Sequence, residues 1–278
     1  MDDYIDDYDK RMDFYDDLYS TKDQSIINTV ITGMDESAKR HLAGNPYLSY
    51  VQMETLAHDA DIEVRSRMAR SRCLPPDLLK NLSKDKKEIV RATALCNPLT
   101  SFSDFKENVI TSKFSAEAKT LICEDVRVLE DFELFEYLWQ KIKGSQPILI
   151  NTLEAYRRSF PADIHPEISS FIHHEIMGGQ ASNSTREAYA EAVYVALPEI
   201  LDTLKTDPYR PVINAIARNG SAWVTTHEYL VDNHKSSGIR ITISAVTNDN
   251  QLLNKIYHGT KSQEIRFWVE QNPAFKSI

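Results

Sequence analysis

Glycine is scarce in this chain: only 8 of its 278 residues are glycine, whereas ~7% is usual. An all-β protein with many tight turns would need more, because several turn types require a residue with positive φ. An enzyme built on several glycine-rich phosphate loops is disfavoured for the same reason. Hydrophobic residues make up 42% and charged residues 26% of the chain. This composition predicts a folded, mostly helical protein.

Cysteine and long apolar segments are also in short supply. Cys73, Cys96 and Cys123 are an odd number of cysteines without a CxxC spacing, which favours reduced thiols over a disulfide framework or a zinc finger. No stretch approaches the roughly 18 apolar residues of a membrane-spanning helix. The acidic N-terminus lacks the apolar segment of a signal peptide. We therefore expect a cytoplasmic protein with no membrane association.

Motifs that carry catalytic chemistry are missing. His173-His174-Glu175 is half of an HExxH zinc motif, but the position of the second histidine is occupied by Gly178. Neither GxGxxG nor a GKS or GKT sequence occurs. No nucleophile with a base and an acid beside it is visible. The sequence thus predicts a non-enzymatic protein with no catalytic residue, no cofactor and no metal site.

A repeat of about 26 residues runs along the chain instead. The segments SAKRHLAGNPYLS, EVRSRMARSRCLPP and IVRATALCNPLTS align, at steps of 26, on Lys39, Arg65 and Arg91. Six residues later in each segment stands a polar residue: Asn45, Ser71 and Asn97. The C-terminal part repeats the pattern at steps of 27 and 26, aligned on Ile213, Arg240 and Arg266.

Each unit has the pattern of a short helix, a polar turn and a second helix. In LPPDLLKNLSKD, Pro75-Pro76 can open a helix, because the first N–H groups of a helix have no partner within it. The following helix is expected to end at an Asn-Pro pair. One such pair of helices cannot bury its apolar faces alone, whereas stacked copies can. The sequence therefore predicts an all-α fold, an α-solenoid over residues 24–278 with an inserted loop near 177–185.

The segment LAHDADIEVRSRMARSRCLPPDLLKNLSKDKKEIVRATALCNPLT resembles the leucine-rich repeat variant family, whose units read roughly L-A-x-D-x-x-x-x-V-R-x-x-x-A-x-N-P-x-x-P-x-x-x-L. It is similar, more loosely, to HEAT-like repeats. The match is good over residues 35–100, fair over 204–275 and weak between them. The resemblance implies a right-handed superhelix, here of about nine short two-helix repeats, with no catalytic motif of its own. Some members carry an N-terminal cysteine cluster for an iron–sulfur centre, but no cysteine precedes Cys73.

Arginines stand at the repeat position, as Arg65 and Arg91 do, and at further positions between these two. One interpretation is that each repeat arginine forks onto an aspartate carboxylate or a turn carbonyl and joins neighbouring repeats. The other is a row of guanidinium groups on a binding surface. Residues 61–91 hold nine bases against five acids, which indicates either a solvated helical face or a surface for an anion or partner. The candidate partner-binding residues here are Arg65, Arg67, Arg70, Arg72 and Arg91.

Residues 1–23 are acidic and aromatic. The first 19 residues hold eight aspartates, and an apolar or aromatic residue recurs every three or four positions at Tyr4, Tyr8, Met12, Tyr15 and Tyr19, which predicts an amphipathic helix. This helix is either a terminal cap with a polar outer face or a segment that docks on a basic partner or imitates a nucleic-acid backbone. The second interpretation makes candidate partner-binding residues of Asp6, Tyr8, Asp13 and Tyr15.

The net charge of −9 disfavours a protein that wraps nucleic acid. We therefore predict a protein-binding scaffold or inhibitor that engages another protein through a charge-segregated solenoid surface. A HEAT-like solenoid that binds nucleic acid through Arg65–Arg91 is the alternative. The last unit stops at Asn272-Pro273 with an apolar layer uncovered, so we also expect a homodimer through the C-terminal repeats.

Overall fold

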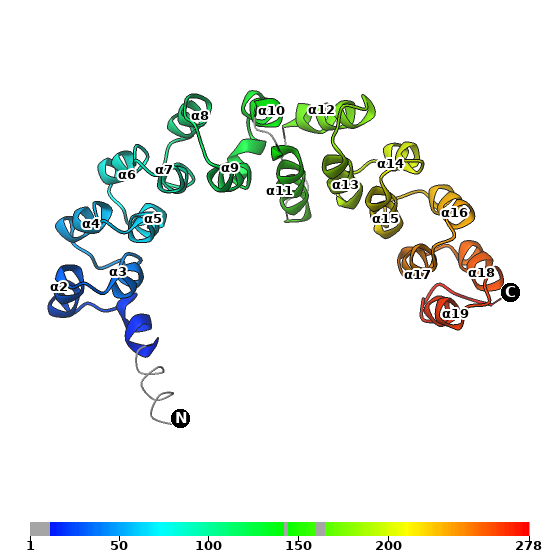
Figure 1. The fold of residues 1–278 in the computed structure, drawn as a ribbon, viewed down its shortest axis with the longest axis horizontal. Helices are drawn as coiled ribbons and strands as arrows, with labels where there is room; N and C mark the ends of the chain where they lie inside the picture. The colour runs from blue at the N-terminus through cyan, green and yellow to red at the C-terminus, as the bar shows by residue number, and fades with distance from the viewer. Residues whose placement is uncertain (1–11, 142–143, 160–164, 278) are drawn as a thin grey trace. The chain divides into compact units, whose positions relative to one another are not determined.

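A computed structural model describes residues 12–141, 144–159 and 165–277 of the chain. Within these residues all regular secondary structure is helical, and none of them forms a β-strand. The chain divides into two compact units, Met1–Asp125 (unit 1) and Val126–Ile278 (unit 2), both drawn in Figure 1. The prediction of an all-α fold with repeated helices is confirmed at this level.

Unit 1 begins, in its described part, with a helical segment at residues 12–18. The helices that follow are α2 (Gln24–Thr32), α3 (Glu36–Leu42), α4 (Tyr50–Ala57), α5 (Ile62–Arg70), α6 (Pro76–Leu82), α7 (Glu88–Leu95), α8 (Phe102–Thr111) and α9 (Ala116–Cys123).

Unit 2 opens with a short 3-10 helix, η1 (Val126–Leu129). Its α-helices are α10 (Phe132–Lys141), α11 (Ser145–Ser159), α12 (Pro166–Met177), α13 (Asn183–Glu191), α14 (Pro198–Leu204), α15 (Arg210–Arg218), α16 (Val224–Asn233), α17 (Ser237–Val246), α18 (Asn250–His258) and α19 (Gln263–Glu270).

The helix starts reproduce the spacing of the sequence repeat. In unit 1, α4, α6 and α8 begin 26 residues apart, as do α3, α5 and α7. Local chemistry sets these starts: Ser49 and Gln52 form a capping box at α4, Asp61 caps α5, and α6 opens at Pro76. The regular spacing of the repeat arginines therefore reflects a regular spacing of helices.

The helices of each unit lie in two rows (Figure 1). In unit 1 the odd row consists of α3, α5, α7 and α9, each packed on the next, and the even row of α2, α4, α6 and α8. The core of the unit fills the space between the rows with side chains such as Leu56, Val64, Met68, Leu78 and Val90, all at most 1% exposed. Because each helix pair completes its core only against its neighbours, the stacking of repeats supplies the apolar burial.

Buried asparagines join each of four repeats to the chain before it. Asn97 Nδ2 donates to the carbonyl oxygens of Ala69 and Ser71, 2.7 and 3.0 Å away, and its Oδ1 accepts from Leu99 N. The same arrangement recurs, with a main-chain carbonyl acceptor in the preceding repeat or N-terminal segment, at Asn45, Asn219 and Asn272. These four side chains, which we call the asparagine staples, satisfy carbonyls at helix ends that burial would otherwise leave without a partner.

The segment near 177–185, expected to be an inserted loop, contains the end of α12 at Met177, residues 178–182 outside any helix, and the start of α13 at Asn183. The added length of this part of the chain lies mainly in α11 and α12, which have 15 and 12 residues. Trp139 is buried, whereas Trp223 and Trp268 are 47% and 42% exposed.

Candidate functional site

The repeat arginine Arg65 is buried in an ion pair between two repeats. It projects from α5 and is 3% exposed. Its Nε and Nη2 donate to the two carboxylate oxygens of Asp85 at 2.7 and 3.1 Å, and its Nη1 donates to the carbonyls of Asp59 and Ala60. The guanidinium thus binds both a carboxylate and turn carbonyls, as the structural interpretation predicted. We call this arrangement the clasp.

Asp59 and Asp85 each bind two basic side chains, one through the carboxylate and the other through the main-chain carbonyl. The carboxylate of Asp59 accepts from Lys39 Nζ at 3.1 Å, and its carbonyl accepts from Arg65. The carboxylate of Asp85 accepts from Arg65, and its carbonyl accepts from Arg91 Nη1 at 2.8 Å. Burial disfavours the charged form of Asp85, but hydrogen bonds from Arg65 and from the backbone N–H of Lys87 outweigh it, so the pKa of Asp85 lies below its usual value.

The clasp recurs in unit 2. Arg186 on α13 donates to both carboxylate oxygens of Asp207, at 2.6 and 3.2 Å, and its Nη1 donates to the carbonyl of Ala181. Arg91 departs from the pattern, because its Nη2 donates to the carbonyl of Lys113 and its guanidinium lies over the ring of Phe114. Arg65 and Arg186 therefore have structural partners on every side.

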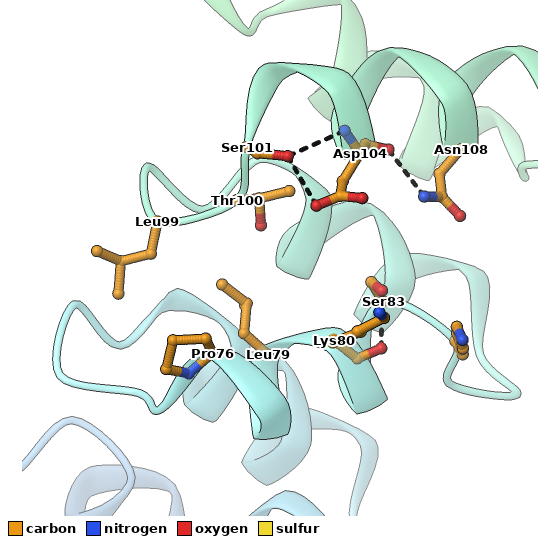
Figure 2. A pocket seen from close by; sticks show the side chains of 10 residues that line it. Pro76, Leu79, Lys80, Ser83, Leu99, Thr100, Ser101, Asp104 and Asn108 are labelled. Carbon is orange, nitrogen blue, oxygen red and sulfur yellow. Dashed lines mark hydrogen bonds between the residues drawn. The ribbon is translucent and has the colours of Figure 1, made fainter.

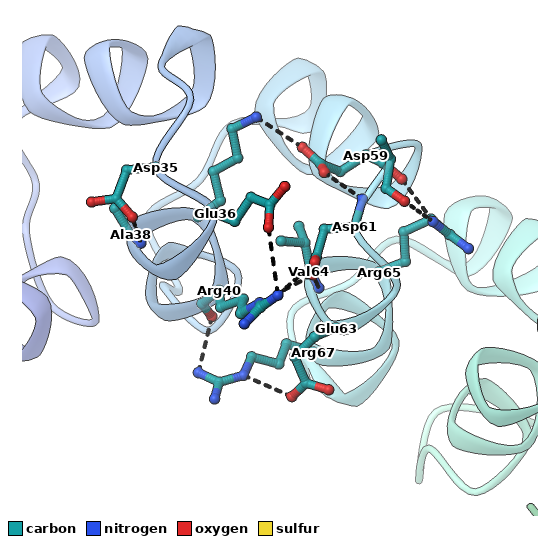
Figure 3. A network of polar contacts seen from close by, with 12 residues as sticks. Asp35, Glu36, Ala38, Arg40, Asp59, Asp61, Glu63, Val64, Arg65 and Arg67 are labelled. Atoms are coloured by element: carbon teal, nitrogen blue, oxygen red, sulfur yellow. Dashed lines mark hydrogen bonds and ion pairs between the residues drawn. The ribbon is translucent and has the colours of Figure 1, made fainter.

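Arg67 belongs to a polar network at the start of unit 1 (Figure 3). Its Nε donates to Glu63 and its Nη1 donates to the Tyr19 hydroxyl and to the carbonyl of Arg40. Arg40 in turn donates from Nε and Nη2 to Asp61, and these hydrogen bonds lower the pKa of Asp61 to about 2. Arg67 is thus engaged within the unit rather than held ready for a partner.

The N-terminal segment lies against α3. Leu18 is 1% exposed, the Tyr15 ring stacks on His41 with centroids 4.9 Å apart, and the Tyr15 hydroxyl donates to Asp35. Tyr19 approaches Gly44 so closely that a Cβ there would lie 2.7 Å from its ring. Tyr15 is consequently occupied by contacts within the unit.

Of the other N-terminal candidates, Asp13 is exposed to solvent. Asp6 and Tyr8 lie outside the described residues.

Six cations on and beside α6 differ from all of these. They are exposed, and in the described part of the chain none makes a hydrogen bond or ion pair through its side chain: Arg70, Arg72, Lys80, Lys84, Lys86 and Lys87. Two acids lie in the same stretch, but Asp85 binds Arg65 and Asp77 accepts from the Tyr50 hydroxyl. We call the six residues the α6 cations. They lie within an 18-residue stretch of a chain whose net charge is −9.

No group of three His, Cys, Asp or Glu side chains among the described residues could hold a metal ion. Burial raises the pKa of the Cys123 thiol to about 12, which removes its nucleophilic form at neutral pH. His173 is half-buried, and its Nε2 lies 3.3 Å from the carbonyl of Val195. None of the described helices has the length and apolar character needed to cross a membrane.

A groove beside the α6 cations was missed by reasoning from the sequence. It lies between α6 and α8, has a free volume of about 240 Å³, and brings Lys80 and Lys84 together with Leu79 and Leu99. A signal for it exists in the repeat alignment. Tyr50 of α4 hydrogen-bonds Asp77 of α6, but 26 residues later the same positions hold Pro76 and Ser103, which cannot form that bond.

The chain matches no protein-family model, and no curated protein or solved structure is significantly similar to it. The resemblance to leucine-rich repeat variant and HEAT-like repeats therefore stays a prediction.

Proposed function

We propose that this chain is a non-enzymatic protein-binding solenoid whose α6 cations bind an acidic segment of another protein. The observation that carries the proposal is the contrast between two sets of bases in unit 1. Lys39, Arg40, Arg65 and Arg67 all pair with carboxylates of the unit, whereas the α6 cations have no such partners. Positive charge held at a surface without internal partners speeds and orients encounter with a negatively charged partner.

The proposed architecture is a right-handed α-solenoid of about nine two-helix repeats. The 26-residue spacing of helix starts and the packing of each odd-row helix on the next support it. In this architecture the N-terminal segment, proposed to span residues 1–23, is a cap, and the burial of Leu18 together with the stacking of Tyr15 on His41 supports that role. The homodimer through the C-terminal repeats stays a prediction.

A protein partner is favoured over nucleic acid by the charge balance. The six α6 cations lie within 18 residues of a chain that carries 41 acids against 32 bases. A long polyanion would extend beyond this small region and meet acidic surface, which repels it. A short acidic segment of a protein meets only the α6 cations.

The proposal is tested by affinity capture from an extract of the source organism, with and without nuclease. Three baits are compared: the wild-type protein, Arg70→Glu/Arg72→Glu, and Lys235→Glu/Lys261→Glu, which makes the same charge change at exposed lysines of unit 2. We expect a protein that is retained by the wild type and the unit 2 variant, lost with the α6 variant, and unaffected by nuclease.

Two outcomes would overturn the proposal. Equal retention by both variants would show that Arg70 and Arg72 do not bind the partner, and would overturn a site that includes all six α6 cations. Retention that nuclease abolishes, together with direct binding of duplex DNA or RNA at ~50 mM salt, would assign the α6 cations to nucleic acid instead.

A further inference from the structure

The groove between α6 and α8 lies between two helices of the even row whose described residues share no side-chain hydrogen bond, whereas such bonds join the earlier helix pairs of this row. Gln52 of α4 donates to Gln24 and Asn28 of α2, and Tyr50 of α4 donates to Asp77 of α6. No hydrogen bond or ion pair joins the described residues of α6 and α8. The groove therefore exists because the bridging side chains of the earlier junctions are absent from this one.

The walls of the groove have different chemistry (Figure 2). Pro76, Leu79 and Leu99 supply apolar surface. Leu99, which lines the cavity, is 52% exposed. Lys80 and Lys84 stand on the α6 side without partners. A ligand that fits must cover an apolar floor and bring negative charge to one wall.

The opposite wall carries hydrogen-bonding groups. The Asp104 carboxylate accepts from the Ser101 hydroxyl at 2.7 Å, and the Asn108 amide donates to the carbonyl of Asp104 (Figure 2). The remaining acceptor oxygens of Asp104 and Asn108 suit the N–H groups of a peptide backbone. A carboxylate on this wall also orients the ligand, because it repels acidic side chains toward the lysines.

We propose that this groove binds a short acidic peptide segment of the partner protein, with an aliphatic side chain seated between Leu79 and Leu99 and carboxylates paired with Lys80 and Lys84. This inference rests on the proposed function and names the part of the α6 region that recognises the partner. The free volume of about 240 Å³ accommodates a large aliphatic side chain but no folded element. Specificity then comes from the spacing between the apolar residue and its neighbouring acids.

The experiment uses the full chain and a fluorescein-labelled peptide in which leucine alternates with pairs of glutamate. Binding is followed by fluorescence anisotropy at ~50 mM salt, where charge interactions are weakly screened. We expect Lys80→Glu/Lys84→Glu to weaken binding at least about tenfold and Leu99→Ser to weaken it about fivefold. The matched controls, Lys235→Glu/Lys261→Glu at exposed lysines of unit 2 and Val51→Ser on the exposed side of α4, should change it less than about twofold.

Exchanging the charges between the protein and the peptide distinguishes a direct contact from a general loss of binding. The Lys80→Glu/Lys84→Glu variant should prefer a peptide in which lysines replace the glutamates, and replacing the peptide's leucines by serine should weaken its binding to the wild type. Because these side chains are exposed, the unfolding temperature of each lysine variant should match that of the wild type. Equal weakening by the unit 2 lysine variant and the groove variant would overturn the groove as the site.

The outcomes separate this inference from the function it rests on. Binding lost with Arg70→Glu/Arg72→Glu but kept with the groove variants would overturn the groove and leave the proposed function standing. No binding of the peptide by the wild type, together with capture of no protein from the extract, would overturn both. Tighter binding of a single-stranded DNA than of the peptide, reduced by the same lysine variants, would replace the peptide by nucleic acid.

Discussion

Arg65 and Arg70 lie on the same helix, five residues apart, but they differ in burial and in bonding partners. Arg65 is buried, with its guanidinium bound to Asp85 and to two turn carbonyls. Arg70 is exposed and has no partner among the described residues. The difference shows that a basic stretch in a repeat protein contains two classes of arginine. One class holds the repeats together, and only the other is available to a ligand.

The largest expected effect comes from breaking the clasp. Asp85→Ala leaves the buried Arg65 guanidinium without its carboxylate, so it should lower the free energy of unfolding by about 3–5 kcal/mol. Asp207→Ala should act similarly in unit 2, because Arg186 is bound in the same way. Urea unfolding measures both changes, with Lys84→Ala as the exposed control expected within about 0.5 kcal/mol of wild type.

A double variant sharpens this comparison. Arg65→Met/Asp85→Leu removes both charges and should recover most of the lost stability, because no buried charge is left unpaired. A loss below about 1 kcal/mol in Asp85→Ala would contradict the structural role of the clasp.

An effect of intermediate size is expected at the asparagine staples. Asn97→Ala leaves the carbonyls of Ala69 and Ser71 without their shared donor, which should cost about 1–3 kcal/mol in the free energy of unfolding. Asn81, exposed on α6, is the matched control and should tolerate alanine. Asn97→Asp keeps the size of the side chain but cannot donate, so stability equal to wild type in that variant would show that the hydrogen bonds do not matter.

The smallest expected effect is a dependence of stability on acid pH. The folded pKa of Asp61 is about 2, below the unfolded value of about 3.9, so the ionised carboxylate favours the folded state. Its contribution is complete above about pH 4 and is lost as the pH falls through about 2. Thermal unfolding between about pH 5 and 2 should therefore show the difference between wild type and Asp61→Asn shrinking.

The control for this titration is Glu36→Gln. The Glu36 side chain is 65% exposed and lies 3.7 Å from Arg40, so it should contribute little. A difference between wild type and Asp61→Asn that stays constant with pH would contradict the coupling of Asp61 to Arg40.

Much of the fold could be predicted from the sequence because the repeat is local. The steps of 26 between Lys39, Arg65 and Arg91 match the steps between the starts of α3, α5 and α7. The place of the extra residues could not be predicted from the repeat step alone, because lengthened helices and a long loop add the same number of residues to it. The exposure of Trp223 could not be read from its apolar neighbours, since it stands at the N-cap of α16 rather than within that helix.

The site was less accessible to prediction. Sequence reasoning left the role of Arg65 open, because its decisive partner, Asp85, lies 20 residues away in the next repeat. It selected Arg70 and Arg72, which are exposed, together with Arg67, which the network around Tyr19 engages. It missed the groove beside Leu99, because this groove results from the absence of hydrogen bonds between the described residues of α6 and α8.

The asparagine staples have a consequence for which segments can precede them. Each staple donates to one or two main-chain carbonyls of the segment before it, and every amino acid supplies such a carbonyl. The staple therefore makes no demand on the side chains at the acceptor positions of the preceding segment. An asparagine at this position can bind any segment that presents its carbonyls there, whereas the clasp requires an aspartate in the neighbouring repeat.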